Sequence, residues 1–139
     1  MARTPLDADE LRAALGGRWA RVQVVEQTGS TNADLLADTG APDRSVLVAE
    51  AQQAGRGRLD RGWTSPPGAG LTFSVLVRPA APIATWGWLP LLTGVTLREA
   101  VSEAAGVEVS VKWPNDLLAA ADGRKLAGIL AQTSGEAVV

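Results

Sequence analysis

Apolar residues repeat along this chain with two different spacings, which predict strands and helices in mixed order. Alternating or continuous apolar runs between turn residues predict strands at 22–27, 45–51, 71–77, 109–113 and 125–131. Helical spacing predicts a short helix at 6–15 and a longer one at 86–105. Because helices are interspersed with hairpin-connected strands, the pattern predicts an α+β fold with a mostly antiparallel mixed sheet flanked by helices.

Polar residues fill the predicted turn after the first strand. Gly29 ends the strand, and Thr31 with Asp34 has the spacing of a helix capping box. Ser30, Thr31 and Asn32 are therefore expected at a strand-to-helix turn. Taken alone, the pattern favours an ordinary helix cap over a ligand site.

The segment Gln52–Trp63 combines three glycines and three arginines within twelve residues. It is not expected to form a core helix or strand, because glycine costs conformational entropy and charges resist burial. Glycine lets backbone N–H groups approach an anion, and arginine supplies a fixed positive charge. A solvated basic loop is the alternative. A loop as long as 53–70 is expected to be mobile without a ligand.

Composition narrows the chemistry. The 139 residues suggest one domain, 1–139, large enough to bury a core. The absence of Cys and His excludes disulfides, a thiol nucleophile and the commonest general base. Lysine is rare, two residues against eleven arginines, which draws attention to Lys112 and Lys125. The three tryptophans at 19, 86 and 88 are expected to serve packing.

Charge and hydropathy indicate where the protein acts. The net charge of −2 argues against a nucleic-acid or membrane-surface binder. Residues 55–78 nevertheless carry four arginines against one aspartate, or +3, as expected for a local anion pocket. Neither a long apolar run nor a signal peptide is visible, so a cytoplasmic protein is expected.

Four motifs in a fixed order carry a family resemblance. They are Gly-Ser-Thr-Asn at 29–32, Gln-Gln-Ala-Gly-Arg-Gly-Arg at 52–58, Lys-Trp-Pro-Asn-Asp at 112–116 and Arg-Lys-Leu-Ala-Gly-Ile-Leu at 124–130. Together they resemble the biotin protein ligases, which join biotin to acetyl-CoA carboxylase, over roughly residues 22–139. The resemblance implies a catalytic domain related to class II aminoacyl-tRNA synthetases, of the monofunctional type without a DNA-binding domain.

The resemblance implies a two-step reaction with biotin, ATP and Mg²⁺. The biotin carboxylate attacks the α-phosphate of ATP, which gives biotinyl-5′-adenylate and pyrophosphate. A lysine of a biotin carboxyl carrier protein, or of a carrier domain of an acyl-CoA carboxylase, then receives biotin. An acyl adenylate is already activated, so this chemistry needs positioning and fixed charge rather than the missing His or Cys.

The resemblance also implies the site residues. Biotin contacts fall on Ser30, Thr31, Gln52, Gly55, Arg56, Gly57, Lys125 and Gly128, with Asn32 supporting the turn. Nucleotide contacts fall on Arg58, Arg61, Trp63, Asn115 and Asp116, and Asp116 is also the expected Mg²⁺ ligand. Catalytic roles fall on Lys125, Arg58 and Lys112. Leu59-Asp60 between the arginines makes this loop less basic than an all-arginine version, which weakens the assignment of Arg61.

Alternative hypotheses remain open at this point. The family continues beyond Val139 with more sheet and usually a small barrel-like domain, so we expect an N-terminal portion that binds biotin and forms the adenylate less well than a longer chain. It is then a partial ligase, an inactive or binding-only fragment, or a lipoate ligase of the same fold. An exposed sheet edge would favour pairing, including a homodimer. A nucleic-acid module is the most distant alternative, and octanoyl transfer is disfavoured because no Cys is present.

Overall fold

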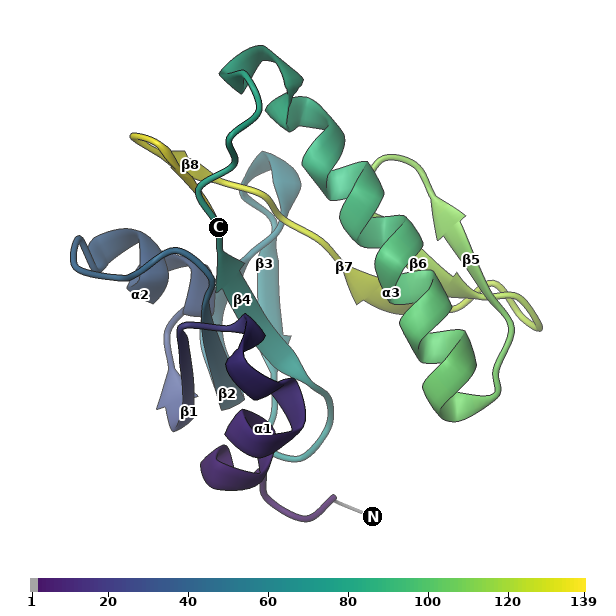
Figure 1. Cartoon of the computed structure of the whole chain (residues 1–139). Coiled ribbons are helices and arrows are strands. Elements are labelled where there is room, and N and C mark those ends of the chain that lie inside the picture. Colours follow the sequence, from purple (N-terminus) through teal and green to yellow (C-terminus); the bar gives the residue numbers. More distant parts are fainter. Residues whose placement is uncertain (1–2) are drawn as a thin grey trace. The chain divides into compact units, whose positions relative to one another are not determined.

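The computed structural model of the protein describes residues 3–139, which form two compact units (Figure 1). The first unit holds the chain up to Pro79 together with Gln132–Val139, and the second holds Ala80–Ala131. None of the described helices is both long and apolar enough to cross a membrane.

The elements follow the predicted mixture of helices and strands. The first unit contains α1 (Ala8–Leu15), the 3₁₀ turn η1 (Gly16–Arg18), β1 (Arg21–Thr28), α2 (Thr31–Ala37), β2 (Ser45–Arg56), the 3₁₀ turn η2 (Arg58–Asp60), β3 (Gly62–Ser65), β4 (Thr72–Leu76), β8 (Thr133–Ser134) and β9 (Ala137–Val138). The second contains the 3₁₀ segment η3 (Ile83–Trp88), α3 (Leu89–Ala105), β5 (Val109–Lys112), β6 (Asp116–Ala119) and β7 (Lys125–Gly128). The predicted α+β class is confirmed.

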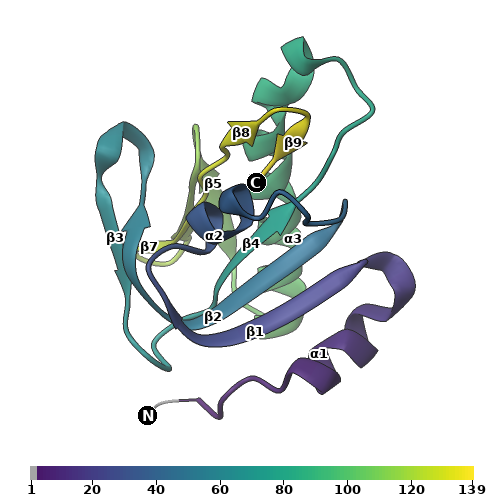
Figure 2. The same cartoon turned by 90° about the vertical axis from the view of Figure 1, so that its left-hand side faces the viewer.

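Strand β2 is the centre of the first unit (Figure 2). One of its edges pairs with β1 in parallel, which sets Thr28 opposite Gln52. The other edge pairs antiparallel with β4 along Ser45–Ala49 and then with β3 from Gln52 onward. Every other strand pair in the described chain is antiparallel, so the prediction of a mostly antiparallel mixed sheet is confirmed.

The two faces of β2 are covered by different helices. Val46 and Val48 pack with Val22 against the apolar side of α1, whereas Leu47 packs with Leu35 of α2. Residues of the C-terminal β8–β9 hairpin complete the second cluster. Burial on both sides explains why β2 reads as a continuous apolar run rather than an alternating one.

The segment Gln52–Trp63 is not a core strand, as predicted, but the prediction of an irregular loop over 53–70 is wrong in its first half. Strand β2 continues to Arg56, turns at η2 and returns as β3, so the segment is a β-hairpin. Its charges remain compatible with a strand because they lie at an exposed sheet edge rather than in the core. Leu59 and Asp60 make the turn with φ of 58° and 57°, a left-handed backbone uncommon for residues other than glycine.

The helix starts also differ in detail from the predictions. Ser30, not Thr31, is the N-cap of α2 and accepts a hydrogen bond from the backbone N–H of Ala33 at 3.2 Å. The predicted capping box is therefore wrong by one position, and Asp34 instead accepts a hydrogen bond from the Thr28 hydroxyl. The predicted helix 86–105 is divided into η3 and α3, with a proline in the first turn of α3, where the missing N–H costs nothing.

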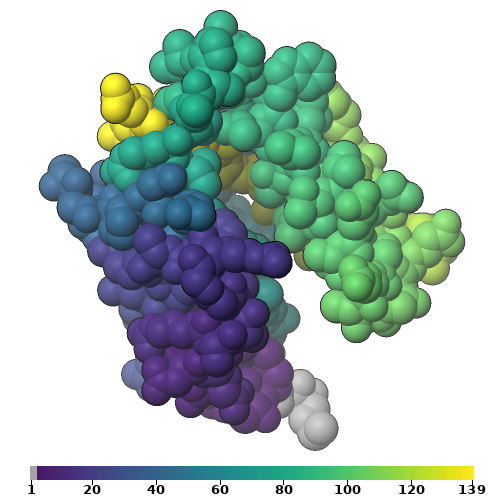
Figure 3. Space-filling model, viewed as in Figure 1, coloured from purple at the N-terminus to yellow at the C-terminus, as the bar shows by residue number. Residues whose placement is uncertain are grey.

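Helix α3 covers the three-stranded sheet of the second unit, and its outer side forms that unit's surface in Figure 3. Gly94 is buried where α3 packs closely against the sheet. A Cβ at this position would lie only 3.3 Å from the Val111 side chain. Trp19 packs in the core as predicted, and Trp86 is half-buried with its indole N–H on the Ala81 carbonyl at 3.0 Å. Trp88 is 70% exposed, so its predicted packing role is wrong.

Candidate functional site

Two of the predicted biotin residues, Thr31 and Gln52, are joined by hydrogen bonds in the first unit. The Gln52 carboxamide Oε1 accepts from the Thr31 backbone N–H at 3.0 Å and lies 3.3 Å from its hydroxyl. The parallel pairing of β1 and β2 brings them together, because β1 ends opposite Gln52 just before α2 begins. Both residues are buried, at 3% and 7% exposure, so their polar groups need these partners.

Three further residues extend this contact into a network that the sequence analysis largely missed. The Ser74 hydroxyl of β4 lies 2.7 Å from the Thr31 hydroxyl and donates to Oδ1 of Asn32. The Asn32 amide nitrogen in turn donates to Oε1 of Gln132 at 3.0 Å. We call Thr31, Asn32, Gln52, Ser74 and Gln132 the Thr31 cluster. Its signal in the sequence was a lone serine in the apolar run 71–77.

Gly55 of the hairpin lies against Gln52 of the Thr31 cluster. A Cβ at this position would overlap the Gln52 carboxamide and lie 2.5 Å from the Trp63 carbonyl oxygen. Strand β2 has a bulge here: Gln52 pairs with Ser65 and Gly55 with Trp63. Glycine is thus required for the close approach that holds the Gln52 side chain in place.

The charged side chains of the arginine hairpin, residues 55–63, are exposed to solvent. Arg56, Arg58 and Arg61 are all exposed. The Gly57 N–H donates to the Arg61 carbonyl at 2.6 Å, and the Arg61 N–H donates to the Arg58 carbonyl at 3.3 Å, so the turn itself is hydrogen-bonded. Trp63 follows on β3 and is 38% exposed. The structure therefore groups the predicted biotin residue Arg56 and the predicted nucleotide residues Arg58, Arg61 and Trp63 on one hairpin.

The remaining predicted residues lie on adjoining strands of the second unit. The Lys125 ammonium pairs with Oδ1 of Asp116 at 2.8 Å, with the two side chains 42% and 21% exposed. Pairing of β6 with β7 sets Asp116 opposite Gly128, and pairing of β5 with β6 sets Lys112 opposite Asp116. Asn115 donates from its side-chain amide to the Ile129 carbonyl at 2.9 Å, which ties the turn before β6 to the end of β7.

The carboxylate of Asp116 is the predicted Mg²⁺ ligand. Within residues 3–139 no group of three or more acidic, His or Cys side chains could hold a metal ion. Magnesium usually takes one or two protein carboxylates and completes its shell with water and substrate phosphates. A single carboxylate is compatible with that arrangement, so the Mg²⁺ ligand stays a prediction that depends on bound nucleotide.

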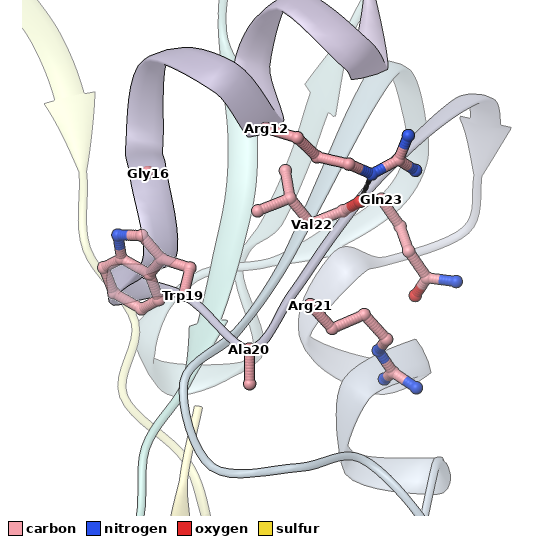
Figure 4. A pocket seen from close by; sticks show the side chains of 7 residues that line it. All are labelled: Arg12, Gly16, Trp19, Ala20, Arg21, Val22 and Gln23. Atoms are coloured by element: carbon pink, nitrogen blue, oxygen red, sulfur yellow. Dashed lines mark hydrogen bonds between the residues drawn. The ribbon is translucent and has the colours of Figure 1, made fainter.

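A separate depression of about 400 Å³ lies beside α1 and β1 in the first unit (Figure 4). It is lined by Arg12, Gly16, Trp19, Ala20, Arg21, Val22 and Gln23, none of which is a predicted site residue. Its two arginines have carboxylate partners, Arg12 with Asp9 at 2.7 Å and Arg21 with Asp38 at 2.6 Å. The hydrogen bond from Arg21 also lowers the pKa of Asp38. This surface is therefore assigned no ligand.

Comparison with known proteins decides the family. The model of the Biotin/lipoate A/B protein ligase family matches residues 19–139. The chain belongs to this family. Among its relatives is the biotin–[acetyl-CoA-carboxylase] ligase of Mycobacterium tuberculosis, 48% identical over 99% of this chain and 54% of that protein. The bifunctional ligase/repressor BirA of Bacillus subtilis is 41% identical over 73% of this chain and 30% of its own length.

Solved structures of biotin protein ligases have the same fold as this family member. The enzyme from Aquifex aeolicus in complex with biotin and ATP superposes with a TM-score of 0.76 at 32% identity, over 86% of this chain and 50% of that one. The enzyme from Leishmania major with biotinyl-5-AMP gives 0.73 at 29% identity, over 86% and 54%. The chain thus spans about half the length of the relatives it matches most fully.

Proposed function

We propose that this chain carries the biotin- and ATP-binding residues of a biotin protein ligase. In the first step, a biotin carboxylate oxygen attacks the α-phosphorus of ATP and pyrophosphate leaves, which gives biotinyl-5′-adenylate. In the second, the neutral amine of a carrier lysine attacks the acyl carbon, AMP leaves and the amine loses a proton. The observation that carries the proposal is the buried contact between Thr31 and Gln52, two motif residues that we assign to the polar head group of biotin.

The relatives support both substrates. Homologous ligases have been solved with biotin and ATP, and with biotinyl-5-AMP. The Mycobacterium relative is named for acetyl-CoA carboxylase, so we propose a biotin carboxyl carrier protein or carboxylase carrier domain as the acceptor. Cytoplasmic location and a single domain over 1–139 stay predictions, and neither a membrane nor nucleic acid is proposed as a partner.

We assign the biotin head to neutral groups. Thr31 and Gln52 offer hydrogen bonds from a buried position, and Ser30 at the start of α2 is a further polar neighbour in the chain. We propose that Gly55 and Gly57, which have no side chains, let the hairpin backbone come close to biotin. The apolar body of biotin needs only packing, which we assign to β7 and its exposed Gly128.

We assign the charged part of the reaction to arginines and lysines. Arg56 and Arg58 neutralise the carboxylate and phosphate, with Arg61 in a weaker supporting role and Trp63 covering the base. Lys125 polarises the reacting carboxylate and stabilises the charge that builds up on the α-phosphate. Lys112, Asn115 and Asp116 serve the phosphates. Mg²⁺ held by Asp116 and the nucleotide would neutralise charge on the leaving pyrophosphate.

Lipoate ligation is the second candidate, because the matched family includes both biotin and lipoate enzymes. The Thr31 cluster favours biotin, since the dithiolane ring of lipoate has no N–H or C=O to meet buried polar groups. A fragment that binds biotin without forming the adenylate is the third candidate. A nucleic-acid module has no support beyond the exposed arginines, and homodimer formation stays a prediction.

Biotin-dependent exchange of pyrophosphate into ATP tests the proposal. The chain should exchange with biotin and not with lipoate, and Lys125→Ala should lower the rate roughly a hundredfold, a typical cost of removing one transition-state charge stabiliser. Lys112→Ala tests the second lysine in the same assay. Circular dichroism should show Lys125→Ala folded, because the pair with Asp116 is partly exposed.

Two results would overturn this function. One is exchange that depends on lipoate alone. The other is an unchanged rate in Lys125→Ala. Biotin binding without any exchange would instead select the binding-only alternative.

A further inference from the structure

The direction of each hydrogen bond in the Thr31 cluster follows from its outermost member. The side-chain carbonyl oxygen of Gln132 accepts a hydrogen bond from the Asn32 amide nitrogen at 3.0 Å. The other end of the Asn32 side chain, Oδ1, is then an acceptor only, so Ser74 must donate to it. A serine hydroxyl has one hydrogen, and this hydrogen is now committed to Asn32.

The committed Ser74 hydroxyl in turn fixes Thr31. Their oxygens are 2.7 Å apart, and either could be the donor on distance alone. Because the only hydrogen of Ser74 points to Asn32, the hydrogen in this 2.7 Å contact has to come from Thr31, for which Gln52 Oε1 at 3.3 Å is a second and more distant acceptor. The Thr31 hydroxyl hydrogen is therefore directed into the protein, and its remaining lone pair is an acceptor.

Gln52 presents the opposite chemistry. Its carbonyl oxygen accepts from the Thr31 backbone N–H, which leaves the amide nitrogen and its two hydrogens to donate. The Gln52 carboxamide fills the space that a Cβ at position 55 would occupy, so it lies directly against the Gly55 backbone. Thr31 and Gln52 together offer one acceptor beside one donor, the complement of a ligand edge with N–H next to C=O.

We propose that Ser74, Asn32 and Gln132 are positioning residues that hold the Thr31 hydroxyl as an acceptor, and so make the site specific for a urea or amide edge. The proposal rests on the proposed function, in which that edge is the ureido ring of biotin. All three residues act through Thr31. They are supplied by three separate segments, the α2 start, β4 and the chain leading into β8, so the local sequence around Thr31 alone does not determine the acceptor.

A double-mutant cycle on biotin binding tests the relay. Calorimetric titration of the whole chain with biotin should show roughly threefold to tenfold weaker binding for Ser74→Ala, and at least as large a loss for Thr31→Val. The double variant Ser74→Ala/Thr31→Val should bind as Thr31→Val does, because Ser74 acts only through the hydroxyl that is already gone. Losses that multiply in the double variant would overturn the proposal.

A matched control separates positioning from folding. Ser45→Ala also removes a buried serine beside β4, one whose hydroxyl donates to the Pro42 carbonyl at 2.6 Å, away from the Thr31 cluster. It should lower the unfolding temperature and leave biotin affinity unchanged. If Ser45→Ala weakened biotin binding as much as Ser74→Ala, the effect would be general loss of packing and the proposal would fail.

Asn32→Asp tests the direction itself. A carboxylate only accepts, so Ser74 can still donate to it, while Gln132 turns its amide to donate. Biotin affinity should stay within about threefold of wild type, whereas Asn32→Leu should weaken binding as Ser74→Ala does. A loss in Asn32→Asp equal to that in Asn32→Leu would show that Asn32 donates to Ser74 and would overturn the relay. Absence of biotin binding by the wild-type chain would instead remove the proposed function itself.

Discussion

The Thr31 cluster and the arginine hairpin each include part of strand β2, Gln52 in the first and Arg56 in the second, but differ in burial and charge. Gln52 is buried and its contacts are neutral and fixed by several neighbours, whereas Arg56, four residues later, is exposed. Neutral hydrogen-bonding groups gain specificity when water is excluded, because an unmatched partner is then costly. Charged groups avoid the desolvation penalty by staying in water until an anion arrives. One strand therefore carries a neutral, buried half and a charged, exposed half.

The largest expected difference between the two halves comes from Arg58→Ala. Loss of charge-assisted hydrogen bonds of about 1.5–3 kcal/mol should weaken binding of the adenylate roughly tenfold to a hundredfold. Affinity for biotin should hardly change, because biotin lacks the phosphate. Equilibrium binding of biotin and of a non-hydrolysable biotinyl adenylate, each at low and high salt, measures both effects. High salt should weaken binding of the adenylate more in the wild-type chain than in Arg58→Ala.

Arg18→Ala is the matched control, since it removes an exposed arginine outside the hairpin. Equal losses of biotin and adenylate affinity in Arg58→Ala would show that the two halves do not divide the ligand between them.

Gly55→Ala probes the point where the two halves meet. The added methyl would overlap the Gln52 carboxamide and approach the Trp63 carbonyl to 2.5 Å. Overpacking of this kind costs about 1–3 kcal/mol in unfolding free energy. Displacement of Gln52 should also weaken biotin binding about tenfold. Urea unfolding and calorimetric titration measure the two losses separately.

Gly62→Ala is its control on the opposite strand of the hairpin, because no atom lies within 4 Å of the methyl that it would add. It should affect neither stability nor biotin affinity by more than a small amount. Identical behaviour of the two variants would show that the contact between Gly55 and Gln52 does not constrain the site.

The smallest expected effect belongs to a charged pair that lies outside both halves. Arg3 pairs with Glu50 of β2 at 2.5 Å, and its side-chain hydrogen bond, followed by one from the Leu6 backbone, lowers the pKa of Glu50. A lowered carboxyl pKa stabilises the fold above the unfolded-state value and loses this contribution as pH falls. Arg3→Ala should therefore cost up to about 1 kcal/mol at neutral pH and less below about pH 4.

Urea unfolding of Arg3→Ala and wild type at the two pH values measures this difference. Biotin affinity should be the same in both proteins, although Glu50 is only two residues from Gln52. A difference in unfolding free energy that does not depend on pH would contradict the pair of Arg3 with Glu50. A change in biotin affinity would show that a charge outside the Thr31 cluster affects ligand binding.

Strands β1, β2, β4, β5 and β7, helices α1 and α3 and the four motif segments were predictable because each has a local signature. Strand β2 was recognised from its apolar run, and α3 from its helical spacing of apolar residues. The motif residues Thr31 and Gln52 were singled out together, and their contact follows from the parallel pairing of β1 and β2.

Residues that depend on distant pairing were not predictable in the same way. Ser74 belongs to the Thr31 cluster only because β4 pairs with β2, and Gln132 only because the chain returns to the first unit after Ala131. The hairpin was missed for a different reason. Glycine and arginine argue against a buried strand, but β2 pairs only with β3 beyond Gln52, which leaves such side chains in water.

The bulge between Gln52 and Gly55 has a consequence for insertions and deletions. Strand β2 advances three residues there while β3 advances two, from Ser65 to Trp63. Side chains beyond the bulge thus change face: in a regular strand with the same residues, Arg56 would share the face of Gln52. Deletion of one residue between these positions would equalise the two strands and remove the bulge, so that Arg56 would keep its face while Gly55 would lose its close approach to the Gln52 carboxamide. The spacing of this motif is therefore as much a part of its function as the residues that it contains.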